Sequence, residues 1–230
     1  SYEQFNYFTQ EGIDKCDNTS RSDRDPSICL NVNNQRDEGV AFYRAYSEAV
    51  VNMSRIWTDA FCENGGCSGG RSPRLVRLMG AQGENENNAL ENNSPRSAAP
   101  ATAYYTLRWK DAFREVDALT IPSYFNPWPE KITEMANDPD YSLDDLMAFL
   151  GDDSDSNGAL GRHEISTDVN VAYLEYLNDA YNLNLKLVAY EGGQHLTEPL
   201  GYCGGQNEPA HNIANLFTAA QRDYRMYDIY

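Results

Sequence analysis

The sequence has no long apolar run and few basic residues. No apolar stretch approaches the ~18 residues that cross a membrane, so we expect no membrane span. Only 18 Lys and Arg residues stand against 35 Asp and Glu residues, which gives a net charge of −17 at pH 7. Such a surface repels nucleic acid and anionic lipid, and it suits calcium, neutral glycans or cationic partners. The simpler interpretation is that the charge only keeps the protein soluble.

Several functional motifs are also missing. The chain starts without an initiator Met or a signal-peptide pattern, so we expect that a leader was removed or that the N-terminus lies inside a longer protein. It has no Gly-rich phosphate loop after a strand, no G-x-S-x-G motif and no basic nucleic-acid patch. Its three histidines show no metal-ligand spacing such as H-x3-H. The sequence therefore gives no indication of these kinds of site.

The five cysteines lack zinc-finger spacing, which favours structural disulfides. Cys62 and Cys67 bracket a short flexible loop, and Cys16 and Cys29 bracket a polar loop, so each pair is suited to a disulfide. Cys203 is left over, and it either stays free or pairs outside the chain. The sequence also has three glycosylation sequons, which begin at Asn18, Asn52 and Asn92. Cysteines and sequons together predict a secreted, extracellular glycoprotein.

Apolar residues recur at helical and strand spacings along the chain. We predict helices over 40–60, 101–115, 143–150, 166–181 and 209–222, and strands over 74–80, 116–122 and 185–190. Pro122 is expected to end the second strand, and a polar loop is expected over 14–38. Helices that alternate with short apolar strands indicate an α/β fold with a parallel sheet. Length favours a single domain over 1–230, although three strands indicate part of a larger α/β structure.

Glu191 is the candidate catalytic carboxylate. It comes directly after the predicted strand 185–190, and functional groups of parallel α/β folds sit at the C-terminal ends of strands. Gly192 and Gly193 would let the backbone turn sharply and leave room for a ligand. Retaining glycosidases use one carboxylate as nucleophile and a second about 5 Å away as acid/base. The alternative is that Glu191 caps the next helix or forms a salt bridge.

The segment 185–196, Leu-Lys-Leu-Val-Ala-Tyr-Glu-Gly-Gly-Gln-His-Leu, resembles a motif of large secreted bacterial proteins of the cellulose-binding or uncharacterised kind. Those proteins are similar to clan A glycoside hydrolases, which are (β/α)8 TIM barrels. Segments 74–82, 117–125 and 185–193 resemble barrel strands five, six and seven. The resemblance covers most of 40–200, and it implies that the chain is the C-terminal portion of such a barrel.

The resemblance also implies where the catalytic pair lies. Clan A enzymes place the nucleophile at the end of strand seven, which matches Glu191. They place the acid/base Glu, after an Asn, at the end of strand four, which would fall before residue 1. Strand eight would fall after Tyr230. The remaining barrel segments would then lie elsewhere on the same chain or on another chain.

Aromatic and polar residues near these strand ends suit sugar binding, because apolar sugar faces stack on rings. Some of them follow strand five or six, and others flank Glu191. Tyr124 and Phe125 have the alternative of being core residues. The expected ligand is a polysaccharide or oligosaccharide. The expected sugar-binding residues are Gln82, Tyr124, Phe125, Trp128, Tyr190, Gln194 and His195.

An acidic insertion over 151–165 fits the calcium-loop pattern D-x-[DN]-x-[DN]-G-x5-E. Calcium takes six to eight oxygens, and alternate positions of such a loop supply them. His163 lies inside this loop, where we expect it to face solvent. The alternative is that acidic Ser, Asp, Asn and Gly loops are common in a protein this acidic. The predicted Ca²⁺ ligands are Asp153, Asp155, Asn157, Ala159, Gly161 and Glu164.

Two functions follow from these features. The first is a retaining glycoside-hydrolase-like barrel with Glu191 as nucleophile and the acid/base Glu outside the chain. The alternative is a non-catalytic extracellular structural or glycan-binding protein derived from such a barrel. A structural calcium site is compatible with both.

Overall fold

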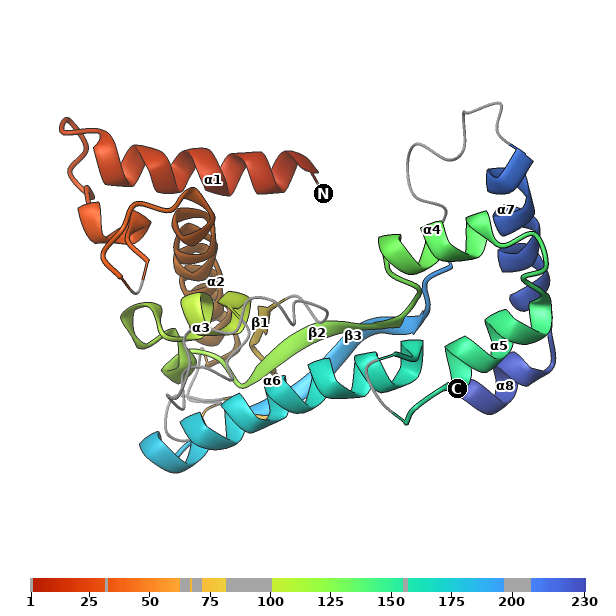
Figure 1. Cartoon of the computed structure of the whole chain (residues 1–230). Helices are drawn as coiled ribbons and strands as arrows, with labels where there is room; N and C mark the ends of the chain where they lie inside the picture. Colours follow the sequence, from red (N-terminus) through yellow and green to blue (C-terminus); the bar gives the residue numbers. More distant parts are fainter. Residues whose placement is uncertain are drawn as a thin grey trace. The chain divides into compact units, whose positions relative to one another are not determined.

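The structure is a computed structural model that describes residues 2–31, 33–62, 67, 72–81, 101–154, 157–196 and 208–230. The chain divides into two units. Unit 1 comprises Ser1–Ile121 and Val169–Val188, and unit 2 comprises Pro122–Asp168 and Ala189–Tyr230. The elements in chain order are α1 (Tyr2–Asp17), η1 (Pro26–Cys29), α2 (Glu38–Cys62), β1 (Leu78–Gly80), α3 (Ala101–Leu107), η4 (Trp109–Arg114), β2 (Ala118–Phe125), α4 (Pro129–Asn137), α5 (Leu143–Gly151), α6 (Ala159–Tyr181), β3 (Lys186–Gln194), α7 (Glu208–Ala220) and α8 (Arg225–Ile229) (Figure 1).

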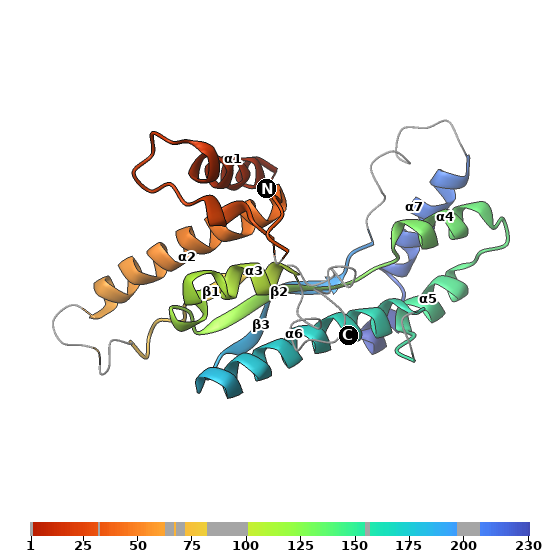
Figure 2. The same ribbon diagram turned by 60° about the vertical axis from the view of Figure 1, so that its left-hand side comes forward.

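The fold is mixed α/β with a three-stranded sheet in the order β1-β2-β3 (Figure 2). β1 and β2 are parallel, with Leu78 opposite Ala118 and Gly80 opposite Thr120. β3 lies beside β2, and the carbonyl of Asp117 accepts a hydrogen bond from the Lys186 N–H at 3.2 Å. The parallel sheet that the alternation of helices and strands predicts is therefore confirmed. The single-domain organisation and the 151–165 insertion stay predictions.

Unit 1 is built on apolar contacts between helices and one end of the sheet. α1 and α2 pack through a small cluster around the Cys16–Cys29 disulfide, with Ile28, Ala41 and Ala45 fully enclosed. A second, larger cluster joins β1 and β2 to α3, η4 and the C-terminal part of α6. Its most deeply buried members include Met79, Leu107, Phe113, Leu119, Tyr173 and Leu177.

Unit 2 has its own core among α4, α5, α7 and α8. Phe125 at the end of β2 contributes to it, together with Leu146 and Leu150 of α5 and Phe217 of α7. α5 begins where the sequence predicts, because the Ser142 side chain accepts from the Asp145 N–H while the Asp145 carboxylate accepts from the Ser142 N–H. No helix within the described ranges is long and apolar enough to cross a membrane.

Both longer strands extend beyond their predicted ends. β2 runs through Pro122 to Phe125, so the expectation that Pro122 ends this strand is wrong. Within the described residues β1 ends at Gly80, opposite Thr120, so Pro122 lies past the last β1–β2 pair. A proline lacks the N–H of a ladder bond and is tolerated where one side of the strand is unpaired. β3 likewise runs through Glu191 to Gln194.

Three α-helices, α1, α4 and α8, were not predicted, and α6 starts earlier than predicted. α1 occupies Tyr2–Asp17, which replaces the first part of the predicted polar loop. β2 ends at Phe125, and after a short connection α4 begins at Pro129, because proline is favoured in the first turn of a helix. α6 begins at Ala159 rather than near residue 166, so the last part of the predicted calcium loop is helical.

Candidate functional site

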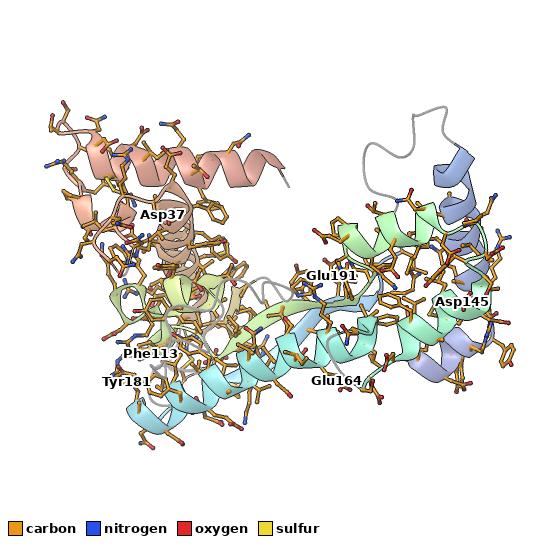
Figure 3. The ribbon with its side chains drawn as sticks, viewed as in Figure 1. Asp37, Phe113, Asp145, Glu164, Tyr181 and Glu191 are labelled. Atoms are coloured by element: carbon orange, nitrogen blue, oxygen red, sulfur yellow. A yellow bond between two sulfur atoms is a disulfide. The ribbon has the colours of Figure 1, made fainter. Side chains whose placement is uncertain are left out.

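Glu191 lies inside β3 in unit 2, with an exposed side chain beside the paired strands β2 and β3 (Figure 3). The expectation that Glu191 directly follows its strand is therefore wrong. Pairing continues past it, since the Phe125 carbonyl accepts a hydrogen bond from the His195 N–H at 3.1 Å. A strand pairing on both sides of Glu191 fixes its backbone more firmly than a loop would.

Tyr124 on β2 is the direct partner of Glu191. The Glu191 carboxylate lies near the Tyr124 hydroxyl, and the Tyr124 ring stacks on the His195 ring with centroids 4.7 Å apart and planes at 24°. Partial burial and, after it, the interaction with the negatively charged Glu191 raise the pKa of Tyr124. Tyr124 therefore stays a hydrogen-bond donor at neutral pH, and it joins Glu191 and His195 on one face of the strand pair.

The two glycines after Glu191 make room for protein atoms rather than for a ligand. A Cβ on Gly192 would lie 2.5 Å from the carbonyl oxygen of Ser123 on the neighbouring strand. Gly193 has a φ of +111°, which other residues rarely adopt, and a Cβ there would lie 2.5 Å from the Tyr230 hydroxyl. That hydroxyl accepts a hydrogen bond from the Gln194 N–H at 2.9 Å. The two glycines therefore do not form the expected sharp turn. They allow Ser123 of β2 and the Tyr230 side chain to approach β3 closely.

Ser123 and Tyr190 precede Tyr124 and Glu191 in the two strands. Tyr190 is 56% exposed, and it acts electrostatically on Tyr124. The Ser123 hydroxyl is 3.0 Å from Nε2 of His163, in the second turn of α6. Burial lowers the pKa of His163 despite the nearby Glu164 carboxylate. His163 is half-buried against β2, so the expectation that it faces solvent is wrong.

The other expected sugar-binding residues have mixed surroundings. Phe125 is 5% exposed and belongs to the core of unit 2, which is the alternative that the sequence leaves open. Trp128 is half-buried next to Phe149, and the Arg162 guanidinium lies 4.7 Å from its ring centroid. Gln82 lies outside the described residues. The structure therefore brings Tyr124, Glu191 and His195 together and leaves Phe125 and Trp128 elsewhere.

No family model, curated protein or solved structure matches the chain.

The predicted calcium ligands fall on both sides of the start of α6. Asp153 is exposed after α5, Asn157 precedes α6, and Asp155 lies outside the described residues. The remaining predicted ligands are in the first two turns of α6, where the Gly161 N–H donates to the Asp152 carbonyl at 2.9 Å. No group of three or more His, Cys, Asp or Glu side chains in the described ranges is arranged to hold a metal. Calcium binding stays a prediction.

The cysteine pairing follows the sequence. Cys16 is bonded to Cys29 and Cys62 to Cys67, with Cα–Cα distances of 6.0 and 5.0 Å. Cys203 lies outside the described residues. Among the sequon asparagines, Asn18 and Asn52 are exposed, and Asn92 lies outside the described residues.

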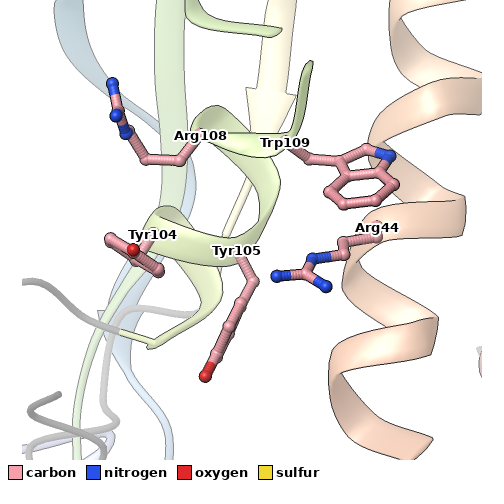
Figure 4. A pocket seen from close by; sticks show the side chains of 5 residues that line it. All are labelled: Arg44, Tyr104, Tyr105, Arg108 and Trp109. Atoms are coloured by element: carbon pink, nitrogen blue, oxygen red, sulfur yellow. The ribbon is translucent and has the colours of Figure 1, made fainter. Parts of the chain in front are cut away.

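Sequence reasoning missed a pocket in unit 1. It lies between α2 and the α3–η4 segment and is lined by Arg44, Tyr104, Tyr105, Arg108 and Trp109 (Figure 4). The sequence gives no separate signal for the run Tyr104-Tyr-Thr-Leu-Arg-Trp109. Its large residues suit the core of a helix 101–115, and its cation is typical of a helix surface. Arg44 is 60 residues away in the sequence, so only the packing of α2 on α3 reveals the set.

Proposed function

We propose that this chain is the carbohydrate-active, C-terminal part of a secreted glycoside-hydrolase-like (β/α)8 barrel, with Glu191 as its nucleophile. In this proposal β1, β2 and β3 correspond to barrel strands five, six and seven. The observation that carries the proposal is the exposed Glu191 carboxylate beside the stacked Tyr124 and His195 rings, on adjacent parallel strands. The two disulfides support a secreted location, because disulfides persist in oxidising compartments.

The chemistry follows from what a nucleophilic carboxylate needs. It must be ionised and aimed at the anomeric carbon. Glu191 is exposed to solvent, and in this proposal the neighbouring Tyr124 hydroxyl donates to it and orients it. Glu191 would attack the anomeric carbon and form a glycosyl–enzyme ester, while an acid protonates the leaving oxygen. That acid is a Glu outside this chain, about 5–5.5 Å from the nucleophile, as in retaining enzymes.

Turnover of polysaccharides and oligosaccharides by the complete protein tests the proposal. Glu191→Gln should abolish release of reducing ends, and Tyr124→Phe should lower kcat about tenfold or more, because a hydrogen bond to a charged group is worth about 1.5–3 kcal/mol. Glu175→Gln is the matched control, since Glu175 is an exposed carboxylate on α6. Equal turnover by the wild type and Glu191→Gln would refute the assignment of the nucleophile.

A second candidate is a non-catalytic glycan-binding protein. The stacked Tyr124 and His195 rings, beside a carboxylate that accepts hydrogen bonds, form a ring platform that suits a sugar without any reaction. Wild-type protein without turnover, but with glycan binding that Tyr124→Ala removes, would favour this function over the first.

We also propose a structural calcium ion in the 151–165 loop. Asp153, Asp155, Asn157 and Glu164 would supply carboxylate and amide oxygens, and the sequence matches every defined position of the loop pattern. Calcium should raise the melting temperature of the protein, and EDTA should reverse the rise. Glu164→Gln should remove the calcium effect, whereas Glu175→Gln should keep it. A melting temperature that does not respond to calcium would contradict this site.

A further inference from the structure

The outer face of α8 in unit 2 carries two highly exposed tyrosines. Tyr224 and Tyr227 are 80% and 86% exposed. They lie three residues apart, so their side chains are neighbours on the helix surface. Tyrosine is enriched at protein interfaces, because its ring buries a large apolar area while its hydroxyl can stay in water. These two rings, the α8 tyrosine pair, are therefore a candidate contact surface.

The other side of α8 fixes the helix on unit 2. Met226 is buried in the core of that unit. Nη1 of Arg225 donates to the Asp144 carboxylate of α5 at 2.8 Å. The Tyr230 hydroxyl, just after α8, accepts from the Gln194 N–H of β3 at 2.9 Å. The tyrosine pair is thus presented from a fixed position, and a partner would not have to order the helix before it binds.

Unit 2 carries most of the negative charge of the chain. Its 16 acidic and 4 basic residues give a net charge of −12, which leaves −5 of the total of −17 for unit 1. Asp228 is exposed on α8, and Asp144 is exposed at the start of α5, which contacts α8 (Figure 1). Arg225 is paired with Asp144 and Asp223, so its charge is neutralised. The tyrosine pair therefore belongs to an acidic surface, on which Arg222 is the other nearby cation.

We propose that the α8 tyrosine pair is the docking surface for a Lys- or Arg-rich segment of a partner protein. A lysine ammonium or an arginine guanidinium is attracted to the face of a tyrosine ring, and the surrounding carboxylates add steering and pairing. A neutral partner would cover the exposed carboxylates of Asp144 and Asp228 without supplying a counter-charge.

A second copy of the chain fits this surface poorly. A two-fold contact places the same patch of both copies together, so two units with a net charge of −12 each would repel one another. The docking surface is also independent of the proposed glycosidase chemistry, because it does not involve Glu191.

Titration of the whole chain with an oligolysine peptide tests this proposal, with an oligoserine peptide as the uncharged probe. The double variant Tyr224→Ala/Tyr227→Ala should weaken oligolysine binding about fivefold or more, although its net charge is unchanged. Tyr7→Ala is the matched control and should bind like the wild type, because Tyr7 is a 65% exposed tyrosine on α1 of unit 1. Arg222→Gln should tighten binding, because it removes an exposed cation two residues before Tyr224.

The wild-type chain offers a second measurement, which needs no variant to fold. The ring NMR signals of Tyr224 and Tyr227 should shift as oligolysine saturates the chain, and those of Tyr7 should not. If the double variant binds oligolysine like the wild type, or if Tyr7→Ala weakens binding as much, net charge alone attracts the peptide and the proposal is overturned. Absence of saturable binding, or oligoserine binding as tight as that of oligolysine, would also overturn it. Self-association of the wild type that the double variant abolishes would instead assign the surface to a second copy of the chain and reject the proposed partner.

Discussion

The Arg77–Asp117 ion pair is predicted to be the strongest single polar contribution to unit 1. Arg77 precedes β1 and Asp117 precedes β2. The Asp117 carboxylate accepts from Nε at 2.9 Å, from Nη2 at 2.8 Å and from the Arg77 main-chain N–H at 2.9 Å. The Asp117 carbonyl also accepts from the Lys186 N–H at the start of β3. One aspartate thus joins the starting ends of all three strands.

Burial sets the size of the effect of Asp117→Ala. The Arg77 side chain is 8% exposed and that of Asp117 is 22% exposed, so removal of the carboxylate leaves an uncompensated, nearly buried guanidinium. Breaking a buried pair on one side costs about 3–5 kcal/mol, and partial exposure of Asp117 places the expected loss near 3 kcal/mol. That is a large share of the 5–15 kcal/mol by which native proteins are stable.

Urea unfolding followed by circular dichroism measures this loss. Arg55→Gln, which breaks the exposed pair with Glu115, should cost only about 0.2–1 kcal/mol. The double variant Arg77→Met/Asp117→Ala should recover part of the stability, because it removes the buried charge as well. If Asp117→Ala costs no more than Arg55→Gln, the pair does not hold the strand ends together and the reasoning fails.

Three further predictions concern other contacts. Replacing both cysteines of the Cys16–Cys29 disulfide by Ser should cost about 3 kcal/mol in urea unfolding, and the shorter Cys62–Cys67 loop about 2, since loop entropy grows with length. Burial opposes ionisation of Glu48, but hydrogen bonds from two lysines and a tryptophan outweigh burial and lower the pKa of Glu48. The ionised Glu48 therefore stabilises the folded state above the unfolded pKa of about 4.3, and this stabilisation is lost as the pH falls through the folded pKa. Glu48→Gln should therefore flatten the loss of stability below about pH 4.5, and an unchanged slope would contradict this. Gly192→Ala should cost about 1–3 kcal/mol, because its Cβ would meet the Ser123 carbonyl, and an equally stable variant would show that β2 and β3 are not so close.

Helices with strong local signals were the most predictable part of the fold. The apolar spacing predicted a helix over 143–150, and α5 covers Leu143–Gly151. The stripe predicted over 40–60 is also a helix, α2, but only its first part is buried. Met53 and Trp57 are 58% and 51% exposed, although they share the spacing of the buried residues. Periodicity predicts which residues share a face, and only tertiary packing decides how far the core extends along that face.

Strand ends were less predictable, because they depend on neighbouring strands. Pro122 and Gly192 both indicate a break when each residue is considered alone. In the structure each lies inside a strand, the proline past the last β1–β2 pair and the glycine against the Ser123 carbonyl. The sequence does not specify which strand lies beside which residue, so the local rule for each residue predicted the wrong boundary.

The same dependence on neighbours explains how much of the candidate site could be predicted. Glu191 and His195 were identified from their place after an apolar run, and Tyr124 from the end of the previous strand. That all three share one face follows from the parallel pairing of β2 and β3, which brings residues about 70 positions apart into contact. A carboxylate held inside a strand, with Tyr124 beside it on the adjacent strand, keeps its geometry without help from a loop. The position of the proposed nucleophile therefore depends on the pairing of β2 with β3. A change that weakens this pairing should impair the proposed site under conditions in which unit 2 is still folded.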